Sequence, residues 1–305
     1  SAASDVYKRQ VFMPGVVGHI GRELKEQLKH NYEIVTLSSR DLPPTEHITY
    51  LRRDIFSLRE MEKALEGIHT VIFFEDPIMR NARKIQGKFE DLYLLISDNI
   101  ARAAEYNNVC QIIYVTENVP YDAVVKCLES YSTPVQKTSV KVSRRPKMLN
   151  MKVDSKNSMR SVHKFIMPEN MDIEDIAMHY FSWLNESGHQ FINVEQTEND
   201  VEISLKANNE TLLHLSYVDR RSKEGIVRYD IVGGKLENKQ SEKRGRMEFR
   251  ALRSEDAFLI ALHDYEPSLP WHLYLLTQAN FHQLVQLVYS VEMRIVNFEM
   301  SGQSV

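Results

Sequence analysis

The sequence predicts an α/β protein, with a doubly wound parallel sheet first and an α+β unit with an antiparallel sheet after it. In the N-terminal half, short apolar segments alternate with segments of helical periodicity. In the C-terminal half, closely spaced alternating segments precede one long amphipathic helix. The 305 residues are enough for two ordinary domains.

The composition is that of a soluble globular protein, with 43% hydrophobic and 26% charged residues. The net charge of -4 gives no general attraction to nucleic acid or to anionic membranes. No apolar run approaches the ~18 residues that span a bilayer. Cys110 and Cys127 show no pairing motif, which fits a reducing compartment. We therefore expect a cytoplasmic protein without nucleic-acid or membrane partners, and the oligomeric state stays open.

Residues 1–10 lack an initiator Met and resemble a translated sequencing adapter, so we expect them not to be native. A genuine N-terminus of an incomplete sequence is the alternative. The first domain is then expected over 11–145. Its predicted strands are 11–13, 33–37, 70–74 and 111–115, and its predicted helices are 20–30, 58–65 and 89–106. Residues 137–145 are a candidate for a last strand.

A glycine-rich turn links the first predicted strand to the first helix. Gly15, Gly18 and Gly21 form G-x-x-G-x-x-G, in which the first glycine permits a tight turn and the second a close approach to a pyrophosphate. The third lets the helix pack closely, and the free N–H groups of the helix face the phosphates. This position in a βαβ unit predicts a Rossmann-type dinucleotide site. The other residues expected in it are Val16, Val17, His19, Ile20 and Phe74.

The end of the second strand distinguishes two dinucleotides. A cofactor without a 2′-phosphate usually meets an Asp or Glu there, whereas this chain has Ser38, Ser39 and Arg40. A guanidinium and two hydroxyls suit a phosphate dianion, which favours NADP over NAD. Asp41 follows directly and weakens this preference, and a solvated loop arginine is the alternative.

With Asp54 and Ile55, this pattern resembles an extended or atypical short-chain dehydrogenase/reductase, of the epimerase-like kind, over about residues 11–142. The resemblance implies that Asp54 and Ile55 contact the adenine. It also implies a Tyr-x-x-x-Lys pair and a Ser or Thr after the strand 111–115. Thr116 stands at the hydroxyl position, but Tyr121 and Lys126 are five residues apart. Thr116 and Tyr121 are therefore only weak catalytic candidates.

The composition then changes. Residues 146–160 are polar and basic and are expected to form a linker, and 161–305 the second domain. Asp172 is expected to cap a helix. Strands are expected at 191–195, 201–205, 212–218, 226–231, 247–252 and 258–262, and a closing helix over 273–299. The stripe of that helix is expected to face the core, with a partner site as the alternative; it comprises Phe281, Leu284, Val285, Val288, Val291 and Ile295.

A curved antiparallel sheet on a long closing helix is similar to the START-like, or helix-grip, fold. The segments 231–236, 245–250 and 263–274 resemble the domain fused to bacterial NAD(P)-binding proteins of this kind. The resemblance implies a small, apolar ligand. Asp264, Tyr265, Trp271 and His272 are weak candidates for its site. His263, His272 and His282 have no metal-ligand spacing, so no metal is expected.

Three functions remain open. The first is an NADP(H)-dependent oxidoreductase or epimerase with an unconventional acid/base. The second is a non-catalytic NADP(H)-sensing regulator, favoured by the missing Tyr/Lys pair. The third is a hydrophobic-ligand-binding protein in which the second domain does the main work.

Overall fold

The computed structural model describes residues 9–16, 19–38, 41–74, 84–116, 121–139, 158–218, 225–238, 241 and 243–302, except the side chain of residue 19. The chain divides into two compact units. Unit 1 comprises Ser1–Asn81 and Tyr93–Asp154, and unit 2 comprises Ala82–Leu92 and Ser155–Val305. The fold class is confirmed: one sheet is parallel and the other is mostly antiparallel.

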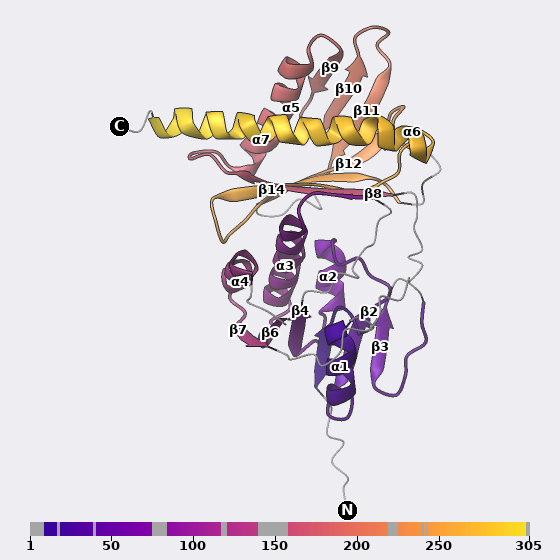
Figure 1. Ribbon diagram of the computed structural model, residues 1–305, viewed down its shortest axis with the longest axis vertical. Coiled ribbons are helices and arrows are strands. Elements are labelled where there is room, and N and C mark those ends of the chain that lie inside the picture. The colour runs from indigo at the N-terminus through magenta and orange to yellow at the C-terminus, as the bar shows by residue number, and fades with distance from the viewer. Residues whose placement is uncertain are drawn as a thin grey trace, which may run out of the picture. The chain divides into compact units, whose positions relative to one another are not determined.

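Unit 1 is built on a six-stranded parallel sheet of order β3-β2-β1-β4-β6-β7 (Figure 1). Counted within the unit, this is the order 3-2-1-4-5-6 of a dinucleotide-binding Rossmann sheet. Its strands are β1 (Gln10–Met13), β2 (Glu33–Leu37), β3 (Ile48–Leu51), β4 (Thr70–Phe74), β6 (Gln111–Thr116) and β7 (Val135–Ser139). Its helices are α1 (His19–Leu28), α2 (Leu58–Ala64), α3 (Phe89–Tyr106, whose first turn belongs to unit 2) and α4 (Asp122–Glu129).

The elements predicted for this half are confirmed to within a few residues, because each buried strand is largely apolar. The sequence did not predict β3 or α4, which are short. The candidate strand 137–145 begins earlier, at Val135, and residues 140–145 lie outside the described part of the chain.

The chain leaves the first sheet after β4 and contributes a strand to the second one. β5 (Lys84–Gln86) pairs in parallel with β8 (Met159–Ile166), and residues 82–92 belong to unit 2. This differs from the expected boundaries, which placed 82–92 in the first domain. Gly87 follows with φ of 119°, and a Cβ there would lie 2.0 Å from the carbonyl oxygen of Val162. Only glycine allows this approach of the two backbones.

Unit 2 has an eight-stranded sheet of order β5-β8-β14-β13-β12-β11-β10-β9. Its other strands are β9 (Ile192–Gln196), β10 (Asp200–Leu205), β11 (Thr211–Tyr217), β12 (Ile226–Gly233), β13 (Arg246–Ala251) and β14 (Ala257–Tyr265). The six predicted strands are thereby confirmed. β8 was missed, and its first two residues fall in the segment expected to be a linker. Strand pairing with β14 overrides the polar composition of that segment.

Two helices cover one face of this sheet. α5 (Ile173–Gly188) begins as predicted at Asp172, whose Oδ1 accepts from the backbone N–H of Asp175 at 2.8 Å. Asp175 returns the contact by accepting from the backbone N–H of Asp172, which completes a capping box. The predicted closing helix is split at Thr277 into α6 (Trp271–Leu276) and α7 (Gln278–Gly302).

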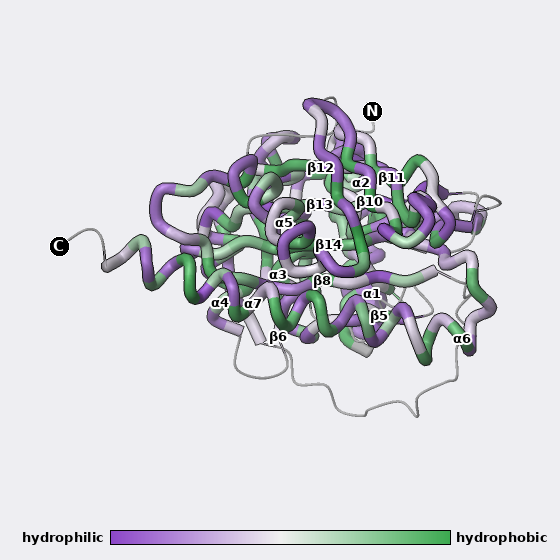
Figure 2. The backbone as a smooth tube through the Cα atoms, turned by 90° about the horizontal axis from the view of Figure 1, so that it is seen from above, coloured by the Kyte–Doolittle hydropathy of each residue, from purple (hydrophilic) through white to green (hydrophobic). Residues whose placement is uncertain are grey.

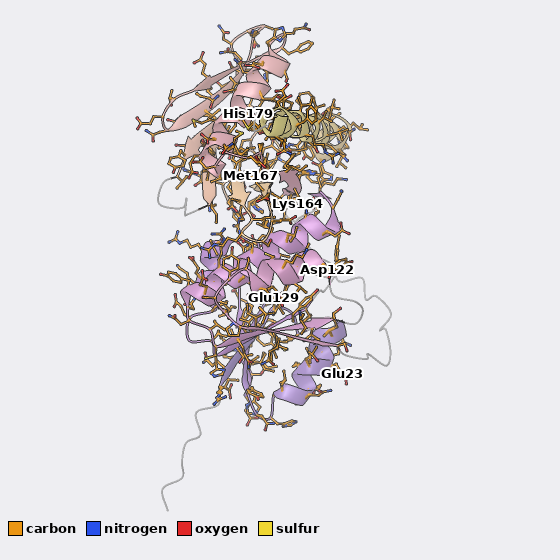
Figure 3. All side chains as sticks on the ribbon, turned by 90° about the vertical axis from the view of Figure 1, so that its left-hand side faces the viewer. Glu23, Asp122, Glu129, Lys164, Met167 and His179 are labelled. Carbon is orange, nitrogen blue, oxygen red and sulfur yellow. The ribbon has the colours of Figure 1, made fainter. Side chains whose placement is uncertain are left out.

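An aromatic cluster holds α5 and α7 on the sheet. The ring of Tyr289 on α7 lies 4.8 Å from that of Tyr180, 4.9 Å from that of Trp183 and 5.5 Å from that of Phe165. His179 of α5, labelled in Figure 3, brings its Nδ1 within 3.2 Å of the Tyr289 hydroxyl oxygen. Tyr289 is fully buried, so it fixes which face of α7 meets the core.

The predicted core stripe of the closing helix is wrong. Five of its six residues are exposed, namely Phe281, Leu284, Val288, Val291 and Ile295, and only Val285 packs against the core. The buried face of α7 consists of Ala279, Gln286, Tyr289 and Met293. The apolar stripe therefore lies on the side of α7 that faces away from the sheet of unit 2.

Two histidines between α7 and β8 make the stability of unit 2 sensitive to pH. The rings of His163 and His282 are 6.5 Å apart, and burial lowers the pKa of each to about 4. Both are therefore neutral in the folded chain at pH 7. An unfolded chain takes up these protons already near pH 6.5.

We expect the free energy of unfolding to decrease as the pH falls from about 6.5 to about 4, by up to about 1.4 kcal/mol per pH unit for each histidine. Urea denaturation of the full chain across this range measures it. The double variant His163→Gln/His282→Gln should reduce the slope, whereas His272→Gln at an exposed position should keep it. An identical slope in the double variant would contradict the assignment.

Candidate functional site

Several described residues of the expected dinucleotide site lie at the carboxyl edge of the first sheet. β1 and β4 are neighbours at the point where the strand order reverses, and ligands of such sheets bind outside the carboxyl ends of the strands at this point. Gly15 follows β1, Phe74 ends β4 and Thr116 ends β6. The fold thus brings together three segments that lie far apart in the sequence.

The turn after β1 depends on a close backbone contact. A Cβ on Gly21 would lie 1.7 Å from the carbonyl oxygen of Gly15 and 3.0 Å from Cζ of Phe74. Only a hydrogen fits there, so α1 can pack directly against the turn. Val16 and Ile20 are buried beside it. This is the packing role expected for the third glycine.

The N-terminus of α1 supplies the groups that would meet a pyrophosphate. Its first turn contains no acidic residue, so nothing in it opposes an anion. The unbonded N–H groups and the positive end of the helix dipole favour a phosphate at this place. Val17, Gly18 and the side chain of His19 lie outside the described residues, and their expected contacts stay predictions.

Charged side chains gather where β2 and β3 end side by side. Leu37 pairs with Leu51, so Ser38 and Arg52 follow at the same edge, and the Ser38 amide donates to the Leu51 carbonyl at 2.9 Å. Arg52 Nη1 lies 3.0 Å from an Asp41 carboxylate oxygen. Sequence reasoning missed Arg52, because the short strand β3 that precedes it was not predicted. Ser39 and Arg40 lie outside the described residues.

Asp54 and Ile55 follow β3, and both are buried. Asp54 Oδ1 accepts from the backbone N–H of Phe56 at 3.1 Å, and the Ile55 carbonyl accepts from Asn99 Nδ2 at 2.9 Å. These contacts shape the turn that leads into α2. Phe74 is also fully buried and packs on α1. Adenine contacts of Asp54 and Ile55 stay a prediction.

The weak catalytic candidates lie at the ends of different elements. Thr116 is buried at the end of β6, while Tyr121 is 41% exposed and precedes α4 as its N-cap. Tyr131 has a different role, because its hydroxyl donates to Oδ1 of buried Asp98, and Oδ2 of Asp98 accepts from Arg102 Nε at 2.8 Å. Burial and the Asp98 charge raise the pKa of Tyr131, so it stays protonated. Tyr131 therefore stabilises unit 1 and is unsuited to proton transfer.

Two of the candidates for an apolar-ligand site in unit 2, Tyr265 and Trp271, pack against the ring of Tyr274. Asp264 pairs with Arg246, and His272 is exposed. Tyr265 donates its hydroxyl to the Leu236 carbonyl at 2.8 Å, and the Trp271 ring packs 5.3 Å from that of Tyr274. Tyr265 and Trp271 thus belong to the core.

A layer of charged residues on β8 and β12–β14 was missed by sequence reasoning. Arg228 donates to Asp230, Arg250 to Glu248, and Arg160 to Nδ1 of His263, at 2.7, 2.5 and 2.6 Å. Burial and then the nearby arginines lower the pKa of His263, which keeps it neutral and able to accept. The signal was the alternation of charged and apolar residues in 246–250. The Arg160–His263 contact joins β8 to β14, whereas the other two contacts each lie within one strand.

Within the described ranges, no cluster of His, Cys, Asp and Glu is suited to a metal ion. Nor does any helix in this part of the chain combine the length and apolar character needed to cross a membrane.

No family model matches the chain. It is similar over almost its full length to the "Auxiliary protein GraX" of Staphylococcus aureus (strain NCTC 8325 / PS 47), with 26% identity over 295 residues that cover 96% of this chain and 95% of that protein. Solved structures resemble it over a smaller part. Two are the Bordetella bronchiseptica enzymes WbmG in complex with NAD and WbmH in complex with NAD+, each 16% identical over 44% of this chain with a TM-score of 0.32.

A third is uronate dehydrogenase from Agrobacterium tumefaciens, 15% identical over 40% of this chain with a TM-score of 0.30. The chain spans about half the length of these structures, which it matches over 54%, 56% and 53% of their own chains. The fold of unit 1 is established by its own strand order.

The different environments of two tyrosines give a test. Tyr131→Phe removes the hydroxyl that donates to buried Asp98, and we expect it to lower the free energy of unfolding by about 1–3 kcal/mol. Tyr121→Phe, at an exposed position, should change it by less than about 0.5 kcal/mol. Denaturant titrations of both variants measure the difference. Equal effects of the two substitutions would contradict the structural role of Tyr131.

Proposed function

We propose that this chain is an NADP(H)-binding regulatory protein, in which unit 1 holds the dinucleotide without carrying out hydride transfer. The observation that carries the proposal is the turn from Gly15 to Gly21. This turn lies at the reversal point of a sheet of order 3-2-1-4-5-6. The Gly15 carbonyl lies so close to the backbone of Gly21 that no side chain fits at position 21.

The residues present suit such a cofactor. The N-terminal amides of α1 would hold the pyrophosphate, and Ser38, Ser39 and Arg40 would meet the ribose phosphate. NADP(H) supplies hydride chemistry where a protein provides an acid/base. Here the chain's own residues bind and orient it.

The preference for NADP over NAD is supported by the Arg52–Asp41 contact. Asp41 was the one residue that argued against a phosphate next to Arg40. Because Arg52 lies 3.0 Å from the Asp41 carboxylate, part of that negative charge is balanced. Both side chains are exposed, so the pair itself is weak. Arg52 thereby adds a second cation at the edge where the 2′-phosphate would lie.

The absence of catalysis is supported by the two tyrosines. Tyr131 is committed to Asp98, and Tyr121 is separated from Lys126 by a spacing that does not place both on one helix face. The relative from Staphylococcus aureus is named an auxiliary protein, which agrees with a regulatory function.

A second candidate is an oxidoreductase or epimerase with an unconventional acid/base. It is favoured by Thr116, which ends β6 at the position of the family's hydroxyl residue. Following NADPH absorbance with a panel of carbonyl substrates separates the two. Binding without turnover supports the regulator, and turnover contradicts it.

For unit 2 we infer a START-like, helix-grip arrangement. The supporting observation is the strand order beyond the edge strand β5: β8 joins β14 and is followed in space by β13 to β9 in reverse chain order, with α7 last in the chain. The apolar ligand expected of this fold is less well supported. The rings of Tyr180, Phe181, Trp183, Phe249 and Tyr289 occupy the space between sheet and helices.

The glycine turn can be tested by one methyl group. Gly21→Ala places a carbon against the Gly15 carbonyl, and we expect at least about tenfold weaker NADPH binding, measured by fluorescence titration. Gly233→Ala is the matched control, because nothing lies within 4 Å of its Cβ. If Gly21→Ala does not fold, Gly18→Val is used instead, which we expect to abolish binding and leave the unit folded. Full binding by both Gly21→Ala and Gly18→Val would contradict the site.

The cofactor preference can be tested by charge. We expect Arg40→Asp and Arg52→Ala to weaken NADPH binding several-fold more than NADH binding, because only the former carries the 2′-phosphate. Arg59→Ala, an exposed arginine on α2, is the control. Isothermal titrations with both nucleotides give the ratio of the NADH to the NADPH dissociation constant for each variant. If neither Arg40→Asp nor Arg52→Ala changes this ratio, the 2′-phosphate does not bind at this edge.

A further inference from the structure

The outward face of α7 carries an apolar seam with a strict repeat. Its members are Phe281, Leu284, Val288, Val291, Ile295 and Phe298, spaced alternately by three and four residues. Between 45% and 79% of each of these residues is exposed. Figure 2 shows green, hydrophobic segments recurring along the whole of α7. A continuous row of large exposed apolar residues marks an interaction surface.

This seam is independent of the attachment of α7 to its own unit. The helix meets the core through Ala279, Gln286, Tyr289 and Met293, which recur at three, four and seven residues on the opposite side. The Tyr289 ring fixes this orientation through its contacts with Tyr180 and Trp183. The seam therefore cannot turn inward without breaking the aromatic cluster.

The spacing of the seam indicates what covers it. An apolar repeat of 3.5 residues keeps a face in register with another helix that has the same repeat, as in a left-handed coiled coil. A second copy of α7 has the same repeat, because its sequence is identical. From this match we propose that α7 forms a parallel, two-stranded coiled coil with α7 of a second copy of the chain, which makes the protein a dimer. This inference goes beyond dinucleotide binding and does not rest on it.

The charges beside the seam favour the parallel orientation. With Val288 and Ile295 at a positions and Val291 and Phe298 at d positions, Arg294 falls at g and Glu299 at the next e. In a parallel pair Arg294 of one copy lies beside Glu299 of the other, twice by symmetry. In a fully overlapping antiparallel pair Arg294 would face Leu287. Among the described residues neither Arg294 nor Glu299 forms an ion pair within its own chain.

The size of the seam is sufficient for association. Six large side chains per copy, each with on the order of 100 Å² to bury, bring two copies to roughly 1,000 Å², where specific interfaces begin. A membrane surface is a poorer match. Helices that lie on membranes are rich in Lys and Arg, whereas α7 carries one arginine and two glutamates.

The test is the mass of the full-length protein in solution, measured by sedimentation equilibrium. We expect wild type to be a dimer, Leu284→Glu/Val291→Glu to be a monomer with unchanged circular dichroism, and Gln283→Glu to stay a dimer. Gln283 is exposed on the same helix outside the seam, so it controls for added charge. A monomeric wild type at concentrations on the order of 100 µM would overturn the proposal. A dimer that survives the double substitution would do so as well.

The parallel orientation of the two α7 helices is tested separately. Arg294→Glu or Glu299→Arg should each weaken the dimer by roughly three- to tenfold, and both together should restore it. In a Cys110→Ser background, which removes an exposed thiol, Val288→Cys should form an intermolecular disulfide on oxidation, because a residues face each other in a parallel pair. Cross-linking that requires Val288→Cys on one copy and Val291→Cys on the other would show the antiparallel pair and overturn the assignment.

Discussion

The contact between the Gly15 carbonyl and the backbone of Gly21 is the constraint on which the arrangement of unit 1 depends. A side chain at Gly21 would separate α1 from the turn after β1, and with it the helix N-terminus from the reversal point of the sheet. The central strand, the first helix and the anion-binding end of that helix are thus positioned by one van der Waals contact. The proposed dinucleotide site is a consequence of this packing and needs no special side chain at the phosphates.

This explains how much of unit 1 could be predicted from the sequence. A glycine that permits a close approach and a strand buried on both faces leave a local signal, so Gly21 and β4 could be predicted directly. The pairing of Arg52 with Asp41 left none, because it arises from two strands that meet only in the sheet. The same holds for Tyr131, which lies after α4 and whose partner Asp98 lies on α3. Residue types were visible, but their partners were not.

For the closing helix a clear sequence signal was present, but the prediction made from it was wrong. Its most regular apolar stripe was expected to face the core, because burial of apolar surface is the dominant stabilising effect in folding. In the structure Tyr289 and Met293 are buried instead, and the Tyr289 ring packs against aromatic rings of α5 and β8. Periodicity alone cannot distinguish a stripe that packs on its own sheet from one that packs on another copy.

A regulatory function requires that the dinucleotide change something outside its own site. The glycine turn lies in unit 1 and the seam of α7 lies wholly in unit 2. If binding at the first alters association at the second, linkage demands the reverse: dimerisation must change the affinity for the dinucleotide by the same factor. A coupling of about 1–3 kcal/mol, typical of such systems, would change the dimer dissociation constant by roughly 5- to 150-fold. An affinity for NADPH that is identical in wild type and in the monomeric seam variant would mean that the two sites act independently.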